Sequence, residues 1–158
     1  MSVFYIISNE KGVKNYEKQN EIKLPEDYRR FITTVAECGT QPFYGLYSIM
    51  RELPSYEVNP VVNEKFPFTV RKPLNLYELS DEEFELFWED ETINVNAGYL
   101  LLCTEGCGMN SILIVNTDDK ETYGTVWFYD LANDAGIYPL INPKNGKPMC
   151  FLDWLEYY

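Results

Sequence analysis

Three short apolar runs in the second half of the chain alternate with glycine and polar turns. The runs span residues 98–104, 110–116 and 124–130, and they are rich in β-branched and aromatic residues. This pattern is typical of consecutive β-strands. The first two runs are apolar at nearly every position, so we expect them in mid-sheet with both faces covered. Gly106 and Gly108, which separate them, favour a tight turn with positive φ.

Helical spacing of apolar residues occurs near both ends of the chain. Residues 9–20 are mostly polar, with a few apolar residues at helical spacing, which predicts a short amphipathic helix. A second helix is expected to open at Leu24-Pro25 and to end at Gly39. Its inward stripe is expected to comprise Tyr28, Phe31, Ile32 and Val35. A terminal helix is expected to line one side with Phe151, Leu152, Trp154, Leu155 and Tyr158.

A helix in the middle of the chain begins with a capping box. Ser80 and Glu83 are three residues apart, so the serine hydroxyl can accept a hydrogen bond from the Glu83 amide while the Glu83 carboxylate reaches back. Phe84, Phe87 and Trp88 lie on one side of this helix, and most of its carboxylates lie on the other. The pattern leaves two interpretations of Trp88 open. It is either part of the inner stripe or an exposed anchor, since tryptophan is enriched at binding hot spots.

The remaining segments complete an α+β fold. Residues 3–7 and 43–49 favour short strands, and residues 137–141 favour an edge strand because they include a proline. Residues 52–73 hold four prolines and no sustained period, which predicts a long irregular connection. We therefore expect a single domain over residues 1–158, with a mostly antiparallel central sheet flanked by N-terminal, middle and C-terminal helices.

Negative charge is concentrated in one segment. The 158 residues include 25 acids and 13 basic residues, which gives a net charge of −12. Residues 73–119 contain eleven of the acids and no lysine or arginine. Such a segment repels nucleic acid and anionic membranes and attracts a basic protein surface. The sequence has no apolar run of membrane-spanning length and no basic start of a secretory signal, so we expect a cytoplasmic protein.

The residue types needed for common catalysis are missing or badly spaced. The chain has no histidine, which is the commonest general base near neutral pH and the commonest zinc ligand. Cys103 and Cys107 lack the C-x2-C spacing of a zinc site, and Cys38 and Cys150 are distant in sequence. Glu105 would raise the pKa of a neighbouring thiol rather than lower it. We expect reduced, mostly buried cysteines, no catalytic residue, no metal and no cofactor.

Several of these segments together resemble the core of the SUKH superfamily. They are Gly98-Tyr99-Leu100, Gly106-Cys107-Gly108 with the aliphatic strand that follows, Gly124-x-Val126-Trp127, Leu24-Pro25-Glu26-Asp27-Tyr28-Arg29-Arg30-Phe31 and Phe151-Leu152-Asp153-Trp154-Leu155. The superfamily contains the fungal Smi/Knr cell-wall regulators and bacterial immunity proteins that neutralise polymorphic toxins. Members usually have Ser, Thr or Asp where Cys150 stands, which leaves the start of the last helix open by a residue or two.

The resemblance implies an immunity protein that binds and neutralises a cognate toxin, with a regulatory scaffold of the fungal kind as the alternative. The acidic charge adds that the toxin is basic, as nucleases are, because enzymes that act on nucleic acid have basic clefts. Exposed acids would speed association and aromatic neighbours would slow dissociation. The expected contact residues are Tyr44, Tyr47, Asp81, Glu82, Glu85, Trp88, Glu89, Asp90 and Glu91.

Overall fold

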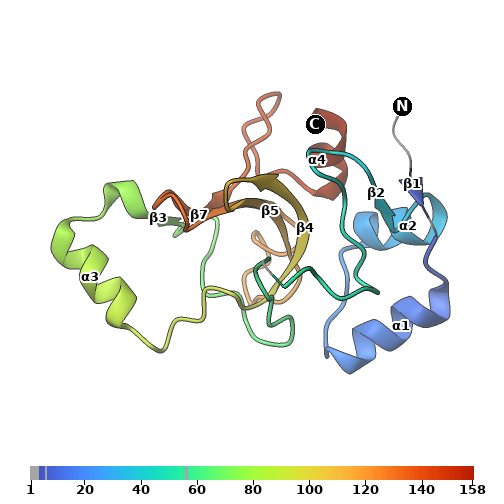
Figure 1. Cartoon of the computed structure of the whole chain (residues 1–158), viewed down its shortest axis with the longest axis horizontal. Coiled ribbons are helices and arrows are strands. Elements are labelled where there is room, and N and C mark those ends of the chain that lie inside the picture. Colours follow the sequence, from blue (N-terminus) through green and yellow to red (C-terminus); the bar gives the residue numbers. More distant parts are fainter. Residues whose placement is uncertain (1–3, 6, 56) are drawn as a thin grey trace.

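The centre of the molecule is a five-stranded antiparallel sheet (Figure 1). The computed structural model describes residues 4, 5, 7–55 and 57–158. The expected α+β fold is confirmed, and the three predicted consecutive strands are all present. In spatial order the strands are β3 (Leu74–Asn75), β7 (Gly136–Pro139), β6 (Val126–Asp130), β5 (Met109–Ile114) and β4 (Tyr99–Gly106).

Both faces of this sheet are covered, and each face has its own core. The first core lies between the sheet and α1 (Glu10–Gln19), α2 (Glu26–Thr34) and α4 (Phe151–Tyr157). The second core lies on the other face, beneath residues 66–76 and the inner side of α3 (Asp81–Glu89). Figure 1 shows α3 at one end of the molecule, with α1 and α2 at the opposite end. Successive residues of a strand point to opposite faces, so β4, β5 and β6 each supply both cores.

The β4 strand lies at an edge of the sheet and not in its middle, as its apolar sequence had suggested. Both of its faces are nevertheless buried, and its outer edge is covered by residues 44–47. The Tyr47 amide donates to the Leu102 carbonyl at 2.7 Å, and the Tyr44 amide donates to the Thr104 carbonyl at 3.4 Å. Residues 43–49 are therefore not the predicted strand. Phe43 and Gly45 both have positive φ, which interrupts an extended backbone.

The predicted helix after Pro25 is correct in its start and wrong in its end. It stops at Thr34, because the Ala36 amide bonds to the Phe31 carbonyl and not to the Ile32 carbonyl, which accepts from the Ser8 amide at 2.8 Å. Val35 is consequently 52% exposed and is not part of the inner stripe. Gly39 does not end the helix. It lies in β2 (Cys38–Gly39), which pairs with β1 (Phe4–Tyr5).

The strand predicted over residues 3–7 is present in part, as β1. Phe4 and Tyr5 form a strand, Ile7 does not, and Val3 and Ile6 lie outside the described residues. The helix predicted over residues 9–20 is confirmed as α1, and residues 52–73, apart from residue 56, are irregular as expected.

The β7 strand is internal, although its proline predicted an edge. It pairs with β6 on one side and with the two residues of β3, which sequence reasoning missed, on the other. Pro139 is tolerated because β3 pairs only with Gly136 and Ile137 and has ended before it. The missing N–H of Pro139 therefore breaks no hydrogen bond to β3.

The terminal helix α4 begins at Phe151, directly after Cys150. Its first amides are satisfied by carboxylates. The Cys150 amide donates to Asp153 at 3.3 Å, and the Leu152 amide donates to Asp27 of α2 at 3.2 Å. This supplies the acceptor that a cysteine side chain supplies poorly. The predicted inner side is right for Phe151 and Trp154 and wrong for Leu152 and Tyr158, which are 44% and 51% exposed.

Candidate partner-binding surfaces

The helix α3 begins at a capping box and packs on the core through half-buried residues only. The Glu83 amide donates to Ser80 Oγ at 3.3 Å, and the Ser80 amide donates to the Glu83 carboxylate at 2.8 Å, so the predicted capping box is confirmed. Hydrogen bonds from the Ser80 amide and hydroxyl hold the pKa of Glu83 below its usual value. None of the residues of α3 is buried. Phe84 and Phe87 are half-buried and pack against the second core.

The outer side of α3 presents carboxylates around two exposed apolar residues. Leu86 is 58% exposed and Trp88 is 46% exposed. Trp88 is therefore not an inner-stripe residue. Its ring contacts Phe87 at 5.1 Å and Phe84 at 6.1 Å between centroids, and nearly half of its surface remains open to solvent. We call this the α3 surface, and its members are Asp81, Glu82, Glu85, Leu86, Trp88 and Glu89.

The carboxylates of the α3 surface are exposed, and no basic residue in the described parts of the chain forms an ion pair with them. Within the described residues, every ion pair involves Arg29, Lys65 or Arg71, and none of these basic residues pairs with an acid of α3. Asp90 and Glu91, just after the helix, are also exposed. Asp90 accepts from the Thr92 hydroxyl at 2.5 Å and the Thr92 amide at 2.9 Å, which lowers its pKa. Negative charge at this helix end is thus partly satisfied by local donors.

Tyr44 and Tyr47 do not join the α3 surface. They lie beside β4, whereas α3 follows β3 at the opposite edge of the sheet. The two tyrosines line a pocket of about 560 Å³ at the turn between β4 and β5, together with Glu57 and residues 106–108. The Tyr47 hydroxyl donates to Glu57 at 2.9 Å. The expected contact residues therefore form two separate groups.

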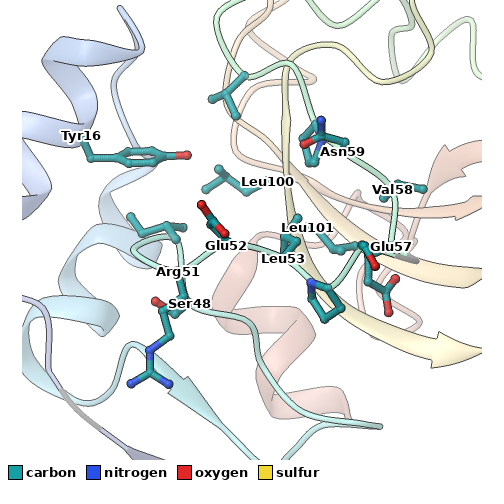
Figure 2. Close-up of a pocket in the computed structure, with 15 residues that line it drawn as sticks. Tyr16, Ser48, Arg51, Glu52, Leu53, Glu57, Val58, Asn59, Leu100 and Leu101 are labelled. Carbon is teal, nitrogen blue, oxygen red and sulfur yellow. The ribbon is translucent and has the colours of Figure 1, made fainter.

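A neighbouring pocket of about 470 Å³ lies between α1 and the start of β4 (Figure 2). The Tyr16 hydroxyl points into this pocket, while the Arg51 guanidinium points away from it. Leu100 and Leu101 of β4 form part of its wall. Burial raises the pKa of Tyr16 to about 12, so its hydroxyl stays protonated at neutral pH. Sequence reasoning missed this pocket, for which the proline-rich connection over residues 52–73 was the only signal.

The cysteines are less buried than predicted. Cys103 is buried, Cys38 and Cys150 are half-buried, and Cys107 is exposed. Cys107 occupies the tight turn between Gly106 and Gly108, and all three residues have positive φ, as the sequence predicts for the two glycines. Burial, followed by the charge of Glu105, raises the pKa of Cys103 to about 12, so this thiol is a poor nucleophile.

Within the parts of the chain that the structure describes, no three His, Cys, Asp or Glu side chains are grouped so that they could hold a metal ion. No helix among the described residues has the length and apolarity needed to cross a membrane.

The sequence profile of the SMI1 / KNR4 family (SUKH-1) matches residues 8–144. No curated protein and no solved structure matches the chain. The matched range includes α1 to α3 and the whole sheet, and it ends before α4.

Proposed function

Because this chain belongs to the SMI1 / KNR4 family (SUKH-1), we propose that it is a non-catalytic immunity protein that binds and neutralises a cognate toxin. The toxin domain is basic, as a nuclease is. The protein acts in the cytoplasm by covering the toxin's functional cleft, and it transforms no substrate. The observation that carries the proposal is the α3 surface, whose carboxylates surround two exposed apolar side chains.

The charge distribution supports a basic partner. The chain has a net charge of −12, and residues 73–119, which include α3, hold no lysine or arginine. A field of this kind accelerates encounter with a positively charged protein, and it repels nucleic acid. Trp88 and Leu86 then supply apolar contact area that slows dissociation.

The first test is whether a toxin partner exists. The protein is co-expressed with the product of the adjacent gene, the complex is isolated, and the rescue of cells from the toxin is measured. A stable complex with rescue supports the immunity function. A complex without rescue supports the regulatory scaffold instead. If no complex forms, the adjacent gene product is not a toxin that this protein binds, and the proposed neutralisation is contradicted.

The α3 surface gives the second test, which is a charge reversal. We expect Glu85→Lys with Glu89→Lys to lower the association rate with the toxin at least about tenfold at low salt and to flatten its salt dependence, because steering depends on these charges. The measurement is stopped-flow association over a range of salt concentrations.

The matched control changes the net charge equally at another place. Glu21→Lys with Glu26→Lys replaces two exposed acids at the α1–α2 end of the molecule. We expect a much smaller effect on the association rate. Equal effects of the two double variants would mean that only the overall charge matters and would remove the α3 surface from the proposal.

A further inference from the structure

Glu105 of β4 is a half-buried carboxylate at the end of a buried hydrogen-bond chain. The Ser111 hydroxyl donates to Glu105 Oε1 at 2.6 Å. The Trp154 indole N–H donates to the same Ser111 oxygen at 3.2 Å. Ser111 and Trp154 are both fully buried, so these two hydrogen bonds are shielded from water. It fixes the position of the carboxylate through one of its two oxygens.

This carboxylate has no basic partner in the described parts of the protein. None of the ion pairs there involves Glu105. Burial raises the pKa of Glu105, and the hydrogen bond from Ser111 opposes that shift only in part. A carboxylate withdrawn from water without a cation is unfavourable for folding. Such a group is typical of a site whose missing charge comes from a partner.

Glu105 shares the α4 face of the sheet with a group of aromatic side chains. Ser111 is opposite Phe128, and Phe128 is opposite Tyr138, so these side chains form one row across three strands. Phe128 and Tyr138 are in ring contact at 5.4 Å. At the end of α4, the Tyr158 ring contacts Phe43 at 5.0 Å and Tyr157 at 4.9 Å. We call Glu105, Phe43, Phe128, Tyr138, Tyr157 and Tyr158 the Glu105 patch.

The patch is partly exposed, and carboxylates act on two of its tyrosines. Phe43, Tyr157 and Tyr158 are 41%, 54% and 51% exposed. Burial, and after it the charge of Glu105, raises the pKa of Tyr158. Burial, and after it the charge of Asp130, raises the pKa of Tyr138. The carboxylates that act on these phenols are Glu105 and Asp130, and their negative charge disfavours an anionic ligand.

From these contacts we propose that the Glu105 patch is a contact site for an arginine side chain of the protein partner. A guanidinium can donate to the free oxygen of Glu105 and stack on the tyrosine rings at the same time. Lysine makes the charge contact without the planar stacking. This inference deepens the proposed function and rests on it for the nature of the partner.

The Glu105 patch and the α3 surface are different sites. The patch lies on the sheet face that carries α4, whereas α3 packs over the other face. The α3 carboxylates are fully solvated and act mainly on the rate of encounter. Glu105 is partly desolvated and hydrogen-bonded, so a charge contact there is stronger and acts on dissociation.

The test needs no toxin and uses the full chain. The probes are the peptides acetyl-Gly-Arg-Gly-amide, its lysine counterpart and its glutamine counterpart, each titrated at 150 mM salt. Binding is followed by ¹H–¹⁵N NMR, in which the Trp154 indole N–H reports directly on the patch. We expect saturable shifts of that signal with the arginine peptide, weaker binding of the lysine peptide and none with glutamine.

Three variants identify the groups responsible. Glu105→Gln is expected to weaken binding of the arginine peptide about tenfold, the loss of one charge-assisted hydrogen bond. Tyr158→Leu is expected to weaken it about threefold, and Tyr158→Phe, which keeps the ring, to leave it within about twofold of the wild type. Glu85→Lys with Glu89→Lys is expected to leave it unchanged.

The outcomes separate this inference from the proposed function. Absence of shifts at Trp154, equal binding to Glu105→Gln, or shifts confined to α3 would each overturn the arginine site, even if the protein neutralises a toxin. If the arginine peptide binds in a way that depends on Glu105 but no toxin complex forms, the arginine site is supported and the proposed function is contradicted. In the toxin complex, Glu105→Gln is expected to raise the dissociation rate, while the α3 double variant lowers the association rate.

Discussion

Glu37 and Glu105 are both carboxylates withdrawn from water, but their surroundings differ. Glu37 is buried and accepts hydrogen bonds from the hydroxyls of Ser8, at 2.6 Å, and Ser48. Glu37, which follows α2, therefore links Ser8 before α1 to Ser48. Both of its carboxylate oxygens accept hydrogen bonds inside the protein. Glu105 has one such donor, Ser111, and an open side. The first is a structural link, whereas the second is suited to an external contact.

The raised pKa of Glu105 predicts a pH-dependent effect on stability. The pKa of Glu105 in the folded protein is above the unfolded value of 4.5, so the fold favours the protonated carboxyl. This contribution to the free energy of unfolding is fully present below pH 4.5, and it is lost as the pH rises through the folded pKa. We therefore expect Glu105→Gln to raise the free energy of unfolding at pH 7, within about 0.5 kcal/mol for a half-exposed site. At pH 4 the difference should vanish, since glutamine resembles a protonated glutamate.

Urea unfolding of both proteins at the two pH values measures this difference. Glu82→Gln, at a fully exposed acid of α3, is the control and should change neither value. A loss of stability on Glu105→Gln at pH 7 would show that the carboxylate serves the fold and needs no partner.

The helix α3 shows how an element can form with little help from the core. It has no buried residue, and its capping box supplies the acceptors for its first amides. The next strand along the chain, β4, is the opposite case. Its edge would be open without the backbone hydrogen bonds of Tyr44 and Tyr47. Local sequence therefore dominates α3, and long-range contacts dominate β4.

Removal of the cap should loosen α3 without unfolding the molecule. We expect Ser80→Ala to remove about 1 kcal/mol from the local stability of α3. The loss should appear as faster amide hydrogen exchange in residues 84–88, with little change in the global urea midpoint. Ser80→Asp keeps an acceptor at the cap and is the control. A drop in the global midpoint with unchanged exchange in α3 would mean that this helix unfolds together with the cores.

The whole molecule has two cores that share one sheet. Adjacent residues of β5, Ile112 and Leu113, are fully buried on opposite faces. We expect Ile112→Ala and Leu113→Ala each to lower the free energy of unfolding by about 2–5 kcal/mol. Both variants should still unfold in one transition, because neither core is complete without the sheet.

Far-UV circular dichroism and tryptophan fluorescence test this cooperativity together. Trp127 reports on the second core and Trp154 on the first. Leu86→Ala on the exposed side of α3 is the control, with an effect within about 0.5 kcal/mol. Separate fluorescence and dichroism transitions in one core variant would show that the two cores are independent.

The local features of this protein could be predicted from its sequence. Ser80 and Glu83 form a helix cap because they are only three residues apart. The glycines at 106 and 108 favour a tight turn because they adopt positive φ easily. The β-branched and aromatic runs likewise identified β4, β5 and β6. The sequence also established the net charge and the concentration of acidic residues in residues 73–119.

Features that depend on distant segments were decided only by the tertiary structure. The end of α2 at Thr34 and the pairing of β3 with β7 arise from contacts between segments far apart in the chain. The same holds for the site: Tyr44 and Tyr47 looked equivalent to the acids of α3, but their hydrogen bonds place them at the opposite edge of the sheet. The sequence indicated for Glu105 only an effect on a neighbouring thiol, whereas the fold brings Ser111 to its carboxylate and Trp154 to Ser111. Sequence fixes local hydrogen bonding, periodicity and charge, whereas burial and partners depend on which distant segments the packed chain brings together.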